Sequence, residues 1–251
     1  MTDGHIIETE SLTKAFKGFT AVSDVNLKVR TGTIHALIGP NGAGKTTVFN
    51  LISKFLDPTH GRIRYKGEDI TKARPADLAR LGMVRSFQIS AVFPHLTVLE
   101  NVRIALQRPT GVSYHFWRPK RFLERLNARA LELLADVGLE EHREDLAVEL
   151  PYGRKRALEI ATTLALDPEL MLLDEPMAGM GRTDITRVSE LIRHVARNRT
   201  VLMVEHHLDV VADLSDTITV LQRGSILAEG SYEEVSTNPE VRKAYMGTGD
   251  D

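Results

Sequence analysis

The segment Gly39-Pro40-Asn41-Gly42-Ala43-Gly44-Lys45-Thr46-Thr47 constrains this chain more than any other. It matches G-x-x-x-x-G-K-[ST], the pattern of a phosphate-binding P-loop. An apolar run over residues 34–38 precedes it, and apolar residues at helical spacing follow it. We therefore predict a strand, a loop and a helix. The glycines let backbone N–H groups surround the β- and γ-phosphates, Lys45 reaches the terminal phosphates, and the Thr46 hydroxyl holds Mg²⁺.

Length, charge and amino-acid composition limit the kinds of protein that this chain can be. The 251 residues suit one large α/β domain or a core with an insert. The net charge of −2 gives no general attraction to nucleic acid or anionic lipid, and the absence of cysteine fits a reducing compartment. The polar start lacks the apolar segment of a signal peptide, and no run of about 18 apolar residues occurs. We expect any function at a membrane to depend on a partner.

Short strands flank the loop in sequence. Residues 6–16 and 21–29 alternate in places and predict half-buried antiparallel strands, with Phe16 at the end of the first. Phe16 either stacks on adenine or belongs to the core. A hairpin over 62–70, a short helix over 75–81 and a strand over 83–87 follow. Gln88 ends that strand, where it either binds Mg²⁺ or positions water, or is a solvated loop residue.

Residues 97–166 predict a mostly helical insert. Thr97 and Glu100 form a capping box that opens a helix through about residue 106. The loop 107–120 is either a docking surface or simply a loop on the protein surface. An amphipathic helix follows it and ends at Gly138. A further helix over 154–166 begins with three basic residues, where the helix dipole disfavours cations. Either an anion binds at this end of the helix, or the three basic residues form a solvated basic face.

Two carboxylates follow a second buried strand. Residues 170–173 are apolar and lead into Asp174 and Glu175, the arrangement of a Walker B motif. We predict that Asp174 holds Mg²⁺ and that Glu175 polarises the attacking water. A further strand over 200–204 ends close to His206, which is either a structural histidine or placed to contact a γ-phosphate. A closing hairpin over 216–228, a capping box at Ser231 and a helix over 239–246 complete the chain.

These motifs, in this order, resemble the ATP-binding subunits of ABC transporters over essentially the whole chain. Phe16 matches the adenine-stacking position, Gln88 the Q-loop and His206 the switch histidine. The signature matches Leu150-Pro151-Tyr152-Gly153-Arg154. More narrowly, the chain resembles the importer subunits for branched-chain amino acids. That narrower resemblance rests on residues 93–102, 107–120, 151–154, 204–206 and 238–247.

The resemblance implies a fold, two cofactors and a set of partners. It implies an α/β P-loop NTPase of the RecA-like type, with an antiparallel β subdomain and a helical insert. Residues 1–96 and 167–251 would form the nucleotide-binding core, and 97–166 the helical subdomain that docks on a permease. ATP with Mg²⁺ would lie between the P-loop of one ATP-binding subunit and the signature of a second. Lys45, Gln88, Glu175 and His206 would be catalytic.

The same resemblance implies a peripheral subunit on the cytoplasmic face of the inner membrane. Two permease subunits would accept an amino acid from an extracytoplasmic binding protein, and no nucleic acid would take part. The sequence departs from the family twice. The signature keeps only the leucine and the second glycine of Leu-Ser-Gly-Gly-Gln, and residues 177–181 lack the aspartate often found there.

Two alternative functions stay open on the sequence. The same ATPase could drive another permease, for urea or other amides inward or for lipid outward. A soluble ABC ATPase for DNA repair or translation is the other alternative. Such proteins usually carry a coiled-coil insertion or two nucleotide domains. The single P-loop of this chain and its lack of a long heptad stretch count against that class.

Overall fold

A parallel β-sheet forms the centre of the fold. The structure is a computed structural model that describes residues 4–86, 92–107 and 124–246. Six strands lie in the order β11-β10-β4-β9-β8-β7, all parallel except β11, which pairs antiparallel with β10 at the edge. Their bounds are β4 Ile34–Ile38, β7 Met83–Ser86, β8 Leu170–Asp174, β9 Thr200–Val204, β10 Thr217–Gln222 and β11 Ser225–Gly230. Every residue of β4, β8 and β9 is buried, as expected for a sheet covered on both faces.

The parallel direction brings the predicted motifs to one edge. Leu37 pairs with Val204 and Val204 with Asp174, so β4, β9 and β8 end side by side. The P-loop, the two carboxylates and the histidine region follow these ends directly. Ligands of open α/β sheets bind at the carboxyl edge of the strands. The fold therefore places three motifs that are far apart in sequence around one location.

A second, antiparallel sheet covers the helix that follows the P-loop. Strand β1 His5–Phe16 pairs with β2 Phe19–Val25, β3 Lys28–Arg30 and β5 His60–Tyr65, and β5 pairs with β6 Glu68–Asp69. Helix α1 Lys45–Ile52 buries four apolar side chains in a core cluster shared by both sheets. The predicted strand over 21–29 is split. Asn26 interrupts it because its side chain bonds to the backbone of Ser11 and Asp24.

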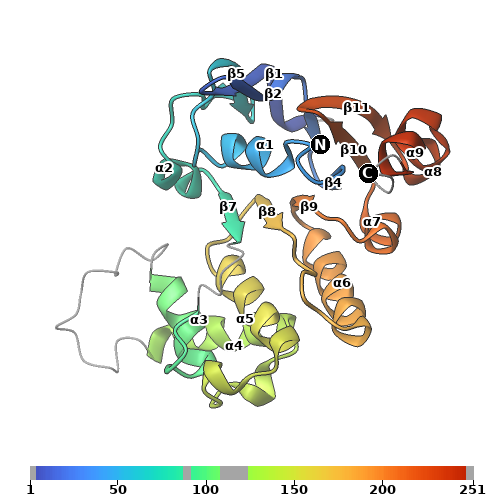
Figure 1. Ribbon diagram of the computed structural model, residues 1–251. Coiled ribbons are helices and arrows are strands. Elements are labelled where there is room, and N and C mark those ends of the chain that lie inside the picture. The colour runs from blue at the N-terminus through green and yellow to red at the C-terminus, as the bar shows by residue number, and fades with distance from the viewer. Residues whose placement is uncertain (1–3, 87–91, 108–123, 247–251) are drawn as a thin grey trace.

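The predicted helical insert forms the lower lobe in Figure 1. It contains α3 Val98–Gln107, α4 Asn127–Asp136 and α5 Tyr152–Leu164, which pack on one another. The Thr97 capping box is confirmed, since Thr97 N donates to Glu100 Oε2 at 3.0 Å and Glu100 N to Thr97 Oγ1 at 3.1 Å. Helix α5 begins at Tyr152, two residues before the predicted start. The loop 107–120 lies outside the described residues beyond Gln107.

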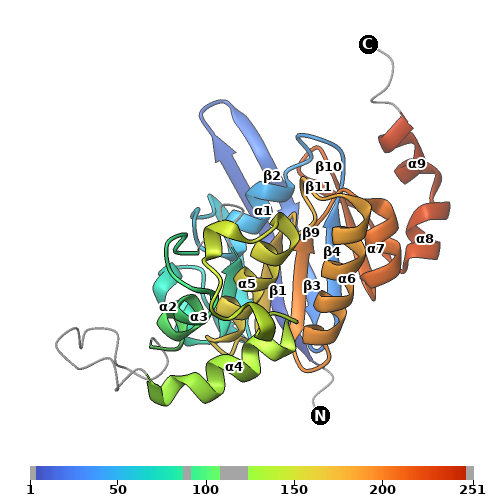
Figure 2. The same ribbon diagram turned by 90° about the horizontal axis from the view of Figure 1, so that it is seen from below.

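The remaining helices belong to the core around the parallel sheet or follow its last strand. The predicted α2 Pro75–Arg80, α8 Tyr232–Thr237 and α9 Pro239–Met246 are present, and the Ser231 capping box is confirmed. The sequence analysis missed α6 Arg182–Ala196 and α7 Leu208–Leu214. Figure 2 shows α6 and α7 on the side of the parallel strands opposite α1. In the described parts of the chain, no helix combines the length and the apolarity needed to cross a membrane.

Candidate nucleotide site

The P-loop depends on glycine at both of its ends. Gly39 has a φ of 148°, and a Cβ there would lie 2.2 Å from the carbonyl oxygen of Leu221. Gly44 has a φ of 101°, and its Cβ would lie 2.7 Å from the carbonyl oxygen of Ala21. Gly44 is also the N-cap of α1, whose first turn holds no acidic residue. The loop thus presents the positive end of a helix dipole beside a backbone that only glycine can form.

Lys45 folds back across the loop. Its Nζ donates to the carbonyl oxygens of Gly39 at 2.7 Å and Pro40 at 3.1 Å. Burial lowers the pKa of Lys45, and the negative charge of Glu175 opposes this shift. Thr46, in the first turn of α1, is exposed. The predicted phosphate ligand and the predicted base are therefore close enough to interact electrostatically.

Asp174 and Glu175 occupy different environments at the end of β8. The Asp174 side chain is 6% exposed, and its Oδ2 accepts a bond from Arg85 Nη2 at 2.6 Å. Glu175 is only partly buried and adopts the left-handed region with a φ of 45°. Its backbone N–H donates to the carbonyl oxygen of Val204 at 2.9 Å, which fixes the turn next to β9. Strain of this kind concentrates at functional sites.

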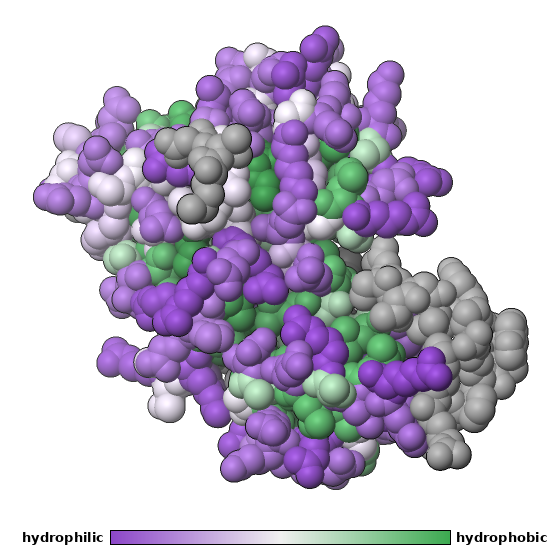
Figure 3. All heavy atoms as spheres, turned by 180° about the vertical axis from the view of Figure 1, so that it is seen from behind, coloured by the Kyte–Doolittle hydropathy of each residue, from purple (hydrophilic) through white to green (hydrophobic). Residues whose placement is uncertain are grey.

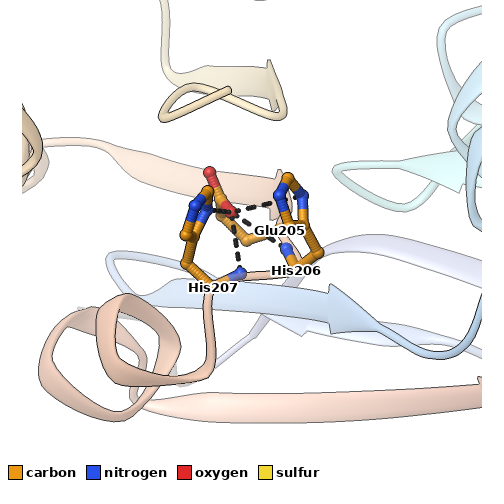
Figure 4. Close-up of side chains that lie close together, drawn as sticks. All are labelled: Glu205, His206 and His207. Atoms are coloured by element: carbon orange, nitrogen blue, oxygen red, sulfur yellow. Dashed lines mark hydrogen bonds and ion pairs between the residues drawn. The ribbon is translucent and has the colours of Figure 1, made fainter. Parts of the chain in front are cut away.

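The acid at position 205 links two loops, a role that the sequence analysis missed. Glu205 is fully buried, and its Oε1 accepts from the backbone N–H of Met177 at 3.0 Å. Its Oε2 accepts from the backbone N–H groups of His206 and His207 at 2.9 and 3.2 Å, and it lies 3.0 Å from Nδ1 of His207. Figure 4 shows both rings beside this carboxylate. Glu205 therefore ties the loop after β8 to the loop after β9.

The same three residues offer ligand atoms within 4.8 Å of one another, the spacing of a possible metal site. The oxygens of the buried Glu205 carboxylate already accept hydrogen bonds from backbone N–H groups. A cation there would displace these bonds and leave buried donors unsatisfied. We therefore interpret the cluster as structural. The His206 side chain itself is 52% exposed toward the carboxyl edge of the sheet.

Phe16 lies at the end of β1 and does not belong to the core. Its side chain is exposed, and Lys14 Nζ lies 5.3 Å from the ring centre. The core alternative for Phe16 is therefore wrong. Gln88 lies outside the described residues.

The signature segment 150–154 lies on the helical lobe. Pro151 is the N-cap of α5, Tyr152 is exposed, and Gly153 is buried against α6. A Cβ on Gly153 would lie 2.5 Å from Asp184 Oδ1. In the described residues, no hydrogen bond or ion pair joins this segment to the P-loop. The chain thus does not bring its own signature to its own phosphate loop.

The basic start of α5 is only partly available to an anion. Arg156 is buried, and its Nη1 donates to Glu159 Oε2 at 2.5 Å. Both alternatives from the sequence are therefore wrong for Arg156, because it forms a buried ion pair one turn along its own helix. Arg154 and Lys155 are half-buried. Burial of one member of a charged run depends on tertiary packing, which its sequence does not reveal.

The C-terminal helix contacts the P-loop region, another feature that the sequence analysis missed. A hollow of about 700 Å³ is lined by Asn41 and Gly42 on one side and by Glu240 and Lys243 of α9 on the other. Burial raises the pKa of Tyr245 to about 12, and the backbone of Gly39 opposes this shift. Helix α9 thus supports the loop from the side away from the helical lobe.

The chain is similar in sequence to proteins of known families. A family described as ABC transporter matches residues 22–178, and one described as branched-chain amino acid ATP-binding cassette transporter matches residues 225–251. The high-affinity branched-chain amino acid transport ATP-binding protein BraF of Pseudomonas aeruginosa is 39% identical over 96% of this chain and 98% of its own. LivG of Escherichia coli, described in the same words, is 38% identical over 96% and 98%.

Solved structures agree with this similarity. An ATP-binding cassette of an ABC transporter in its ADP conformation superposes with a TM-score of 0.84 at 29% identity, covering 97% of this chain and 99% of that chain. A nucleotide-free ATP-binding cassette gives a TM-score of 0.82 at 31% identity, covering 96% and 98%. The predicted α/β P-loop fold with an antiparallel subdomain and a helical insert is confirmed.

Proposed function

The chain belongs to the ABC transporter family of ATP-binding proteins, and on this premise we propose that it is the ATP-hydrolysing subunit of an importer for branched-chain or related amino acids. One observation carries the proposal. The P-loop, Asp174-Glu175 and His206 meet at one sheet edge in a chain whose similarity to BraF and LivG extends over nearly its full length. The substrate class comes from the names of those relatives.

The P-loop residues 39–47 bind the phosphates of ATP in this proposal. Backbone N–H groups and the dipole of α1 attract the phosphate charge. Lys45, whose Nζ now satisfies two loop carbonyls, turns to the terminal phosphates. Glu175 accepts the proton of the attacking water, and the exposed His206 donates to the γ-phosphate. Phe16 stacks on the base, and Gln88 positions water or the cation.

Mg²⁺ fits the oxygen atoms that the site offers. Thr46 is an exposed residue that carries a hydroxyl group, and none of the described residues donates a hydrogen bond to Oδ1 of Asp174. Hydroxyl and carboxylate oxygens are the hard ligands that Mg²⁺ prefers. When bound there, Mg²⁺ would neutralise charge that develops on the phosphate oxygens.

A second ATP-binding subunit completes each site. The signature residues Pro151, Tyr152, Gly153 and Arg154 lie on the helical lobe and make no bond to the P-loop of their own chain. We propose that they contact the nucleotide of the partner subunit when two subunits close head to tail. The exposed Tyr152 and the start of α5 are the surface for this contact.

We propose that residues 97–166 form the helical subdomain and that residues 1–96 and 167–251 form the core. Described residues from both parts line a groove of about 460 Å³. Phe55, Leu78 and Met83 line it from the core, and Ile104 and Thr162 line it from the helices. Figure 3 shows apolar residues at the surface along the waist between the lobes. We propose that a permease subunit docks on this side. The protein would then be peripheral to the cytoplasmic face of the membrane, with an extracytoplasmic binding protein upstream.

Glu175→Gln tests the assignment. We expect unchanged ATP affinity and a turnover lower by about 10²–10⁴, the usual contribution of a general base. Glu190→Gln, on the exposed face of α6, is the matched control and should keep wild-type turnover. Steady-state phosphate release and leucine uptake should be measured with the permease partners reconstituted in vesicles. Wild-type ATP hydrolysis by Glu175→Gln would contradict the catalytic assignment. ATP hydrolysis by the wild-type transporter without uptake of leucine would contradict the proposed substrate class.

A further inference from the structure

Arg85 contacts the carboxylate that is proposed to bind Mg²⁺. It lies on β7, where it pairs in register with Leu172 of β8, two residues before Asp174. Its Nη2 donates to Asp174 Oδ2 at 2.6 Å, and the two side chains are 13% and 6% exposed. This is a partly buried, charge-assisted hydrogen bond, so it is stronger and less screened by water than an exposed ion pair.

The P-loop helix holds the guanidinium of Arg85 in place. Nη1 donates to Asn50 Oδ1 at 2.6 Å and to Ser53 Oγ at 2.9 Å. The guanidinium carbon lies 4.9 Å from the ring centre of Phe49 and 5.2 Å from that of Phe55. A planar fork held by two acceptors and two rings has one orientation, and arginine does not lose its charge in proteins. Arg85 therefore joins α1 to the carboxylate at the end of β8.

This bond makes the two oxygens of Asp174 unequal. Oδ2 is occupied by Arg85, whereas Oδ1 receives no hydrogen bond from the described residues. Mg²⁺ takes near-ideal octahedral geometry and is usually bound through single carboxylate oxygens and waters, whereas Ca²⁺ readily takes both oxygens of one carboxylate. A carboxylate whose second oxygen is bonded to arginine is therefore a better ligand for Mg²⁺ than for Ca²⁺.

We propose that Arg85 is a positioning residue that restricts Asp174 to one-oxygen coordination and so makes the site select Mg²⁺ over Ca²⁺. The proposal rests on the function proposed above, in which Asp174 is the metal ligand. Arg85 touches neither nucleotide nor cation in this account. It acts through Asp174, and its effect is on the choice of cation rather than on nucleotide affinity.

The test compares cation preference in three variants. Arg85→Met removes the bond to Oδ2, and Arg85→Lys keeps a charge but cannot hold Asp174, Asn50 and Ser53 together. Arg64→Met is the matched control, because Arg64 forms an exposed ion pair with Glu10 on the other sheet. Mn²⁺ bound to the protein with ADP is followed by electron paramagnetic resonance while Mg²⁺ or Ca²⁺ is titrated as competitor. The readout is the ratio of the two competitor affinities, which needs no hydrolysis.

We expect Arg85→Met to shift this ratio at least about tenfold toward Ca²⁺, Arg85→Lys to shift it less, and Arg64→Met to leave it unchanged. A purely structural role would weaken both cations equally and leave the ratio at its wild-type value, which would overturn the proposal. If Arg85→Met does not fold, Ser53→Ala is the variant that tests the proposal, because Ser53 Oγ accepts a hydrogen bond from Arg85 Nη1. Loss of one support should shift the ratio about threefold in the same direction, and no shift would overturn the proposal.

Asp174→Asn separates failure of this proposal from failure of the proposed function. If Asp174→Asn binds Mn²⁺ with ADP as the wild type does, the metal assignment itself is wrong. If Asp174→Asn loses Mn²⁺ and Arg85→Met keeps the wild-type ratio, the assignment stands and only the role of Arg85 is refuted.

Discussion

Glu205→Gln perturbs a side chain that joins the loops carrying Glu175 and His206. The native carboxylate accepts bonds from the backbone N–H groups of Met177, His206 and His207 in a fully buried position. A glutamine with its carbonyl oxygen at the Oε2 position keeps the bonds to residues 206 and 207. Its amide nitrogen then faces the N–H of Met177, where two donors meet and one bond is lost.

The loss of one hydrogen bond to Glu205 sets the expected loss of stability. A hydrogen bond to a charged group contributes about 1.5–3 kcal/mol, so the free energy of unfolding should fall by about that amount. In a chain of this size each kcal/mol lowers Tm by about 2–4 °C, so Tm should fall by roughly 3–12 °C. Misplacement of catalytic groups by about 1 Å costs about 10²-fold, and we expect kcat to fall toward that limit while the KM for ATP changes little.

Urea unfolding and steady-state ATP hydrolysis measure the two effects. The matched control is Glu229→Gln, because Glu229 is exposed and its Oε2 accepts from Thr219 Oγ1 at 2.6 Å, a bond that an amide oxygen can keep. That control should stay within about 0.5 kcal/mol of wild type. If Glu205→Gln matches wild type in both unfolding and kcat, the link between the two loops has no role and the reasoning is refuted.

Lys45→Ala should weaken ATP binding and abolish hydrolysis together, because Lys45 is the cation of the phosphate loop; calorimetric titration with unchanged affinity would contradict this. Burial lowers the pKa of His35 from 6.5 to about 4. The unfolded chain therefore takes up a proton between pH 6.5 and pH 4 that the folded chain does not, and stability falls as pH falls through this window. At pH 5 the loss is about 2 kcal/mol relative to pH 7.5, and urea unfolding of His35→Gln should lack it. Pro151→Ser should change ATPase activity less than about tenfold when assembled with the partner subunits, because the start of α5 and Arg154 remain to attract phosphate. A hundredfold gain would show that the native signature is impaired.

The motifs and most elements followed from the sequence alone. The P-loop is a local pattern, since its glycines set φ and its position between an apolar run and a helix is readable in order along the chain. The capping boxes at Thr97 and Ser231 are equally local, because each joins residues three apart. The apolar run before Asp174 predicts a strand buried on both faces wherever it lies. Helix α6 was missed although it is amphipathic, because no residue in it belonged to a recognised motif.

Only the tertiary structure decided which distant residues meet. Arg85 and Asp174 are 89 residues apart, and their contact exists because β7 and β8 pair in parallel in one register. Glu205 reaches Met177 because β9 lies beside β8. The pair of Arg156 and Glu159 is local, since the two residues are three apart on α5, and tertiary packing decides only that the pair is buried. Sequence patterns act over one helical turn or one strand, whereas strand order and burial are set by the whole core, so the sequence determined the chemical groups and the fold determined their partners.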